Sequence, residues 1–161
     1  MHTTASRRLS SFTEGETLMD ERIAKLRTPE QCEQFIRNVQ VRLPDLAKEA
    51  RRRCVELRAE AWGARGEVER EALQAVYAYE EVLSAKNGKR TTASRTWPMI
   101  KRRGILAAVE SVVTRRDATV AYQALSEMGL QDFSFEAVVT RFPEHFTAKA
   151  IEKAKQRLSE C

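Results

Sequence analysis

The sequence contains little of what marks several protein classes. Among its 161 residues are only six glycines, four prolines and two histidines. So few helix-breaking residues favour a helical chain over one built from short strands and tight turns. The longest apolar run covers residues 105–109, far short of the roughly 18 residues that indicate a membrane span. The sequence therefore predicts a protein without a membrane segment.

Cysteine is also scarce, and Cys32, Cys54 and Cys161 form no CxxC pair. With only His2 and His145 beside them, they make a poor zinc set, so we expect no metal and no cofactor. A chain with few, unpaired cysteines fits the reducing cytoplasm, which is the location we predict.

Two of the cysteines are related by their positions in an expected helical hairpin. Cys32 and Cys54 lie at equal separations on either side of position 43, where the hairpin is expected to turn. Both should therefore sit at a similar level and face inward. We expect two buried free thiols, and a disulfide between them is the open alternative.

Helix signals recur along the chain. Thr28 followed by Pro29 is typical of a helix start, and Asn87-Gly88 is typical of a helix stop. Between and beyond these signals, apolar residues recur with helical spacing, whereas no convincing strand pattern is present. We predict an all-α bundle of about seven or eight helices. The expected helical ranges are 29–42, 44–63, 67–86, 97–103, 105–113, 118–128, 135–142 and 148–158.

These ranges also suggest a domain organisation. Residues 1–18 are rich in Ser and Thr without a helical pattern, which predicts a disordered leader, and Met19 offers an alternative start. Residues 19–161 are expected to form one helical domain. Within it, residues 28–63 form an N-terminal hairpin that packs on a C-terminal bundle at 66–161. A division between the two near Gly63 and Gly66 is the alternative.

Charge is distributed unevenly. The net charge is +5, but residues 84–116 contain nine basic residues against one acid, Glu110, which amounts to +8. Residues 64–83 contribute −3. A dense basic segment can bind the phosphates of DNA or RNA, because Lys and Arg release the counterions condensed on them. It can equally be a solvated surface or pair with neighbouring acids.

We therefore expect a nucleic-acid-binding segment at residues 86–103. Trp97 would either stack on an unpaired base or anchor the segment in the core. The alternative function is a helical interaction or regulatory module that docks on an acidic protein. The predicted contact residues are Lys86, Lys89, Arg90, Arg95, Trp97, Lys101, Arg102 and Arg103.

Catalytic patterns are absent, so the chain is predicted not to be an enzyme. Gly88-Lys89 lacks the upstream glycine and the following Ser or Thr of a P-loop. Residues 117–142 have helix-turn-helix spacing, but Arg141 is the only basic residue of the second helix, which favours packing. His145 is interpreted as a packed or capping residue, and Glu69 and Glu80 as salt-bridge partners instead of metal ligands.

Overall fold

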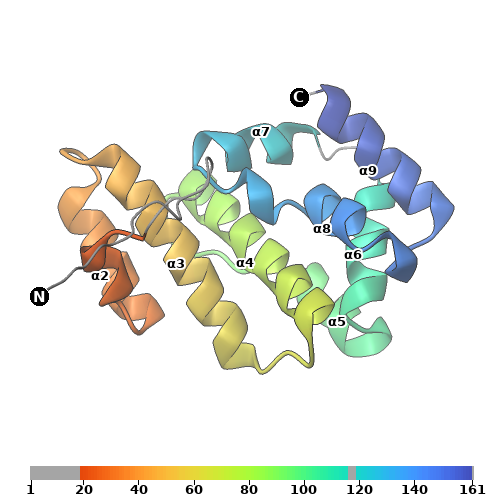
Figure 1. The fold of residues 1–161 in the computed structure, drawn as a ribbon, viewed down its shortest axis with the longest axis horizontal. Helices are drawn as coiled ribbons and strands as arrows, with labels where there is room; N and C mark the ends of the chain where they lie inside the picture. Colours follow the sequence, from red (N-terminus) through yellow and green to blue (C-terminus); the bar gives the residue numbers. More distant parts are fainter. Residues whose placement is uncertain (1–18, 116–118, 161) are drawn as a thin grey trace, which may run out of the picture.

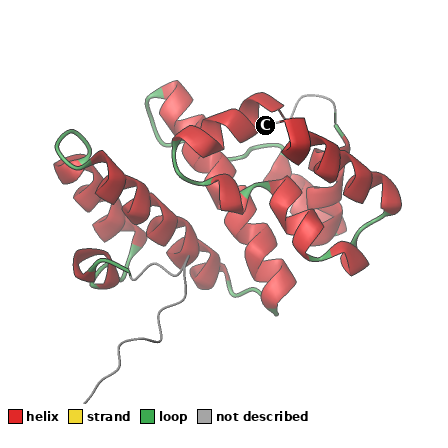
Figure 2. Ribbon diagram, turned by 45° about the horizontal axis from the view of Figure 1, so that its top comes forward, coloured by secondary structure: helices red, strands yellow, loops and turns green. Residues whose placement is uncertain are grey.

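The structure is a computed structural model that describes residues 19–115 and 119–160 (Figure 1). Within these residues the chain is helical and contains no strand (Figure 2). The predicted all-α fold is confirmed, while the predicted leader at 1–18 lies outside the described residues. In chain order the elements are α1 (Glu21–Ala24), α2 (Pro29–Val39), α3 (Pro44–Trp62), α4 (Glu67–Asn87), α5 (Thr96–Arg103), α6 (Ile105–Thr114), α7 (Thr119–Glu127), the 3₁₀ turn η1 (Gln131–Phe133), α8 (Phe135–Arg141), the 3₁₀ turn η2 (Pro143–His145) and α9 (Ala148–Glu160).

The predicted hairpin is formed by α2 and α3. The Thr28 hydroxyl accepts a hydrogen bond from the amide of Gln31 at 3.1 Å, and Pro29 occupies the first helical position. The inward side chains of α2, among them Ile36, pack on one face of α3 around a small core. Apolar residues that recur with helical spacing along α3 are buried as far as Leu57. The next one, Ala61, is exposed, because α2 begins level with the middle of α3 and leaves its last turn uncovered.

Helix α3 also has a second buried face, which periodicity did not predict. Val55 packs with Ala78 of α4 and with Leu130, and Ala59 belongs to the core shared with α4. The helix therefore contacts α2 on one side and α4 on the other (Figure 1). Small residues on the α4 side allow this close packing of two helices.

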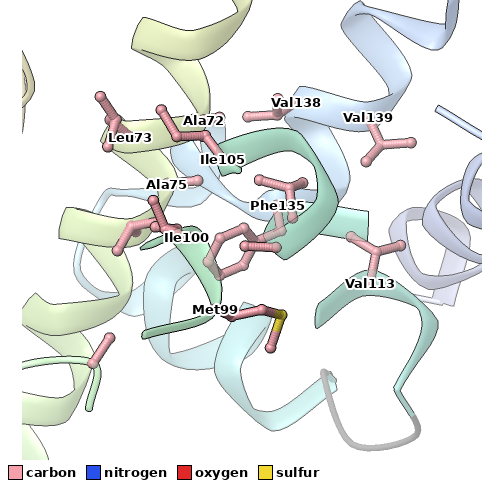
Figure 3. Close-up of a cluster of buried hydrophobic side chains, with 14 of the residues drawn as sticks. Ala72, Leu73, Ala75, Met99, Ile100, Ile105, Val113, Phe135, Val138 and Val139 are labelled. Atoms are coloured by element: carbon pink, nitrogen blue, oxygen red, sulfur yellow. The ribbon is translucent and has the colours of Figure 1, made fainter. Parts of the chain in front are cut away.

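Helix α4 occupies the centre of the molecule and contacts α3, α6, α7 and α8. Ala72 and Val76 are fully buried on its inner face. They belong to the main core, where Ile105 of α6 and Val138 of α8 gather opposite α4 (Figure 3). The apolar stripe of α4 is thus covered by the helices that follow it.

Side-chain caps set where α8 and α9 begin. Ser134 accepts a hydrogen bond from the amide of Ala137 at 3.0 Å, and Thr147 accepts one from the amide of Ala150 at 3.3 Å. Helix α1 and the two 3₁₀ turns were not predicted, because an element of three or four residues is too short to show a period.

No described helix combines the length and the apolar character needed to cross a membrane. Whether residues 19–161 behave as one domain or divide near Gly63 stays a prediction.

Candidate nucleic-acid interface

The predicted contact segment, residues 86–103, folds back along α4. Gly88 closes α4 in the left-handed conformation, with φ of 69°, which a glycine adopts without strain. The amide of Thr91 then donates to the hydroxyl of Ser84 at 2.8 Å, and the amide of Ala93 donates to Oε2 of Glu80 at 2.8 Å. Later residues of the segment thus contact earlier residues of α4, so the segment runs antiparallel to the helix.

Trp97 is the residue that anchors the segment. Its indole Nε1 donates to Oε2 of Glu80 at 2.5 Å, and its ring lies 5.2 Å from that of Tyr77, tilted by 53°. The side chain is partly buried and packs against the main core. Of the two roles predicted for Trp97, these contacts correspond to the anchor. The indole hydrogen bond and one side of the ring are already engaged within the chain.

Arg90 is engaged by acids of its own chain. Its guanidinium lies 3.1 Å from the carboxylate of Glu81, 3.5 Å from that of Glu33 and 3.8 Å from that of Glu80. Glu33 also pairs with Arg58 at 2.7 Å. The loop after α4 is therefore fastened both to α4 and to α2 of the hairpin, and the charge of Arg90 is largely balanced.

The other six predicted basic contacts are exposed. Among the described residues, none of them forms an ion pair within 4.0 Å. One lies in the last turn of α4, one follows the glycine that ends that helix, one lies just before α5, and three form the last turn of α5. In chain order they are Lys86, Lys89, Arg95, Lys101, Arg102 and Arg103.

The structure does not bring these six cations into one cluster. Helix α5 lies beside the N-terminal half of α4, whereas Lys86 is in the last turn of α4, at its opposite end (Figure 1). Lys101 to Arg103 are in the last turn of α5. Cations in the last turn of a helix also offset the partial negative charge of its carbonyl end, which explains their positions without any ligand.

A pocket that sequence reasoning missed adjoins the segment. Its volume is about 480 Å³. The loop at 91–96 forms one wall, and α4, α6, α7 and α8 form the others. No sequence signal pointed to it, because the walls come from five separate parts of the chain. Of the predicted contact residues, Arg95 lines this pocket.

The two hairpin cysteines face each other, as predicted. Cys32 and Cys54 are fully buried and free. The adjacent thiol of Cys32, assisted by a hydrogen bond that Nε of Arg58 donates to Sγ of Cys54 at 3.4 Å, lowers the pKa of Cys54. The same thiol contact, together with burial, raises the pKa of Cys32. The structure thus contains the thiol pair and not the disulfide alternative.

Arg141, His145 and Glu69 lie outside the predicted contact segment. Arg141 is in α8, the second helix of the helix-turn-helix spacing, and is its one basic residue. It forms an ion pair with Glu71 at 2.7 Å, so its side chain is held by a contact within the fold. His145 is exposed in η2 and not packed, since it points out of a short surface turn. Glu69 caps a turn by accepting from the amide of Arg65 at 3.1 Å. Within the described part of the chain, no three His, Cys, Asp or Glu side chains are placed to hold a metal ion.

Comparisons with protein-family models, with curated proteins and with solved structures found no match to this chain.

Proposed function

We propose that this protein binds DNA or RNA through phosphate contacts along residues 86–103, with little sequence preference, and that it does so in the cytoplasm without catalysing a reaction. The observation that supports this proposal is the set of six exposed cations in a segment of the chain that contains no acid. Each exposed Lys or Arg can neutralise one phosphate and release its counterion. Trp97 holds the segment in place and is not assigned a contact with bases.

The spacing of the cations suits an extended polyanion better than a compact one. The groups at the ends of α4 and α5 lie on either side of the Trp97 anchor, with Arg95 between them in the chain. Phosphates on a nucleic acid repeat every few ångströms, so one strand can meet separated cations at the same time. Arg90 is left out of the contact set because three glutamates already surround it.

Fluorescence anisotropy with a labelled 20-mer duplex and the matching single strand tests the proposal. Six phosphate contacts predict that log K falls against log salt with a slope of about −5 on duplex DNA. The triple variant K101Q/R102Q/R103Q should weaken binding at least tenfold and reduce the slope by about 3. A control triple, K25Q/R37Q/R42Q, removes the same charge from exposed residues of the hairpin region and should change affinity less than threefold.

Two results would overturn the proposal. One is the absence of binding at micromolar protein in low salt, where multiple phosphate contacts are strongest. The other is an equal loss of affinity in both triple variants, which would mean that net charge alone attracts the nucleic acid.

Docking on an acidic protein is the second candidate function. The observation that favours it is Arg90, which shows that this segment pairs readily with carboxylates. A pull-down separates the two functions. One stoichiometric protein retained after nuclease treatment supports the acidic partner, whereas nucleic acid that is recovered and then lost on nuclease treatment supports the leading proposal.

A further inference from the structure

The pocket beside the loop at 91–96 has the size and composition of a small-molecule site. Its volume of about 480 Å³ lies within the range of roughly 300–1,000 Å³ that is usual for ligand pockets. The apolar part of its wall comes from four helices: Leu83 of α4, Val112 of α6, Leu125 of α7 and Phe135 of α8. These side chains can enclose a hydrocarbon body.

Aromatic rings line the same pocket. Tyr79 and Phe135 meet edge to face with ring centroids 6.1 Å apart, and Tyr122 of α7 also lines the pocket. Rings prefer offset or edge contacts with further rings, so a flat aromatic body fits this wall better than a flexible chain.

The charges in the pocket favour an anion. Three charged residues line it: Arg95, Arg115 and Glu136. Glu136 is buried, and its Oε2 lies 3.1 Å from the guanidinium of Arg157, so its charge is already balanced from outside the pocket. The two arginines have no ion-pair partner among the described residues. The unbalanced charge of the pocket lining is therefore positive, and the two arginines carry it.

Hydroxyl groups add hydrogen-bonding capacity. Thr96 is buried and lines the pocket, yet its hydroxyl forms no hydrogen bond with any described residue, and the same is true of the hydroxyls of Thr92 and Ser94. Thr92 and Ser94 lie in the loop before α5, and Thr96 is the first residue of that helix. Arg95 lies directly between Ser94 and Thr96 in the chain. A few polar groups converging on an apolar pocket is the usual arrangement of a ligand site.

We propose that this pocket binds a small amphipathic anion, namely a carboxylate or a phosphate monoester carried on an aromatic body. Arg95 and Arg115 contact the anionic group, the loop hydroxyls donate to it, and the aromatic and aliphatic side chains enclose the body. This site is separate from the proposed phosphate contacts on nucleic acid, with which it shares only Arg95.

Three probes with one common body test the proposal: 2-naphthoate, 2-naphthyl phosphate and uncharged 2-naphthol. They are titrated into the full chain and followed by amide chemical shifts in ¹H–¹⁵N spectra. At least one of the two anions should shift the amides of Ala93, Thr96 and Leu125, with a Kd of about 1 mM, as expected for a ligand of this size. Which anion binds more tightly identifies the headgroup. 2-Naphthol should bind at least fivefold more weakly.

A pair of matched variants tests whether an arginine of the pocket binds the anionic group. Arg115→Gln should weaken binding of the preferred anion at least fivefold and leave 2-naphthol unchanged. Arg42→Gln removes the same charge from an exposed residue that belongs neither to the pocket nor to the proposed nucleic-acid contacts, and it should leave anion binding within twofold. Because Arg115 is not among the proposed nucleic-acid contacts, loss of anion binding here can be told apart from failure of nucleic-acid binding.

Each of four results would overturn the proposal. Three of them are the absence of shifts at the pocket amides up to 10 mM anion (about ten times the expected Kd), equal binding of 2-naphthol and the anions, and an equal effect of Arg42→Gln and Arg115→Gln. Shifts confined to residues 101–103 would likewise overturn it, since they would show attraction to the exposed basic turn only.

Discussion

The carboxylate of Glu80 accepts the indole N–H of Trp97 at 2.5 Å, from a side chain that is only 2% exposed. The same oxygen accepts the amide of Ala93, and Arg90 lies 3.8 Å from the other oxygen. One buried acid thus holds the backbone, the tryptophan and the arginine of the segment that follows α4.

Removing this acid should be strongly destabilising. Glu80→Ala leaves one buried and one partly buried N–H group without an acceptor, and is expected to lower the free energy of unfolding by about 3–5 kcal/mol. Glu80→Gln keeps one acceptor oxygen and should cost about half as much. Urea denaturation measures both. Glu152→Ala, an exposed acid on α9, serves as the control and should cost less than about 0.5 kcal/mol. A cost below 1 kcal/mol for Glu80→Ala would contradict the anchoring role.

Trp97→Phe should separate anchoring from base stacking. The variant loses the hydrogen bond to Glu80 and is expected to be less stable by about 1–2 kcal/mol. Its affinity for single-stranded DNA should stay within about twofold, whereas loss of a stacked base would cost about 1–3 kcal/mol. Anisotropy titration of the folded variant measures this. Trp62→Phe is the matched control, because Trp62 is 45% exposed at the end of α3.

Arg157 should be essential to the C-terminal part of the bundle. It pairs with Glu136 in the interior and donates to the carbonyls of Val113 and Arg115 at the end of α6. Arg157→Ala leaves a buried carboxylate unpaired and should lower the free energy of unfolding by about 3–5 kcal/mol.

The double variant E136L/R157M should recover at least half of that loss, since a buried ion pair can be replaced by apolar side chains. For comparison, Arg141→Ala breaks the exposed pair with Glu71 and should cost less than about 1 kcal/mol. Similar costs for Arg157→Ala and Arg141→Ala in urea denaturation would refute the buried role of Arg157.

Glu56 should make stability depend on pH. Burial raises the pKa of its carboxyl above the ordinary value, against the opposing effect of Arg53 and Arg52. A raised pKa means that the folded chain binds the proton more tightly than the unfolded chain. Stability from this group therefore falls as pH rises through the unfolded value of about 4.3.

Glu56→Gln removes this dependence. It should raise the free energy of unfolding at pH 7 by less than about 1 kcal/mol, and the gain should vanish near pH 3.5. Denaturation at the two pH values measures the difference. Glu152→Gln, which changes an exposed acid on α9, should show no such gain. A gain of equal size at both pH values would exclude titration of Glu56 as the cause.

The helices could be predicted because their signals are local. The cap at Thr28 and the stop at Gly88 each depend on residues within one turn. These features fix where a helix begins or ends before any tertiary packing forms.

The electrostatics of the candidate interface could be predicted only in part. The basic segment is visible in the sequence, but the pairing of Arg90 with Glu33 joins residues 57 positions apart. Which cations are balanced depends on how the hairpin lies on α4, and no local pattern contains that information. The pocket was missed for the same reason, since residues from 79 to 136 line it.

The two buried faces of α3 bear on how the molecule can be divided. The chain has a natural place to cut between Gly63 and Gly66, but the hairpin cut there would carry Val55 and Ala59 into water without α4 to cover them. Such a fragment would expose an apolar surface and would tend to aggregate or to dimerise through it. The glycines therefore lie in a turn between α3 and α4, two helices that share buried contacts.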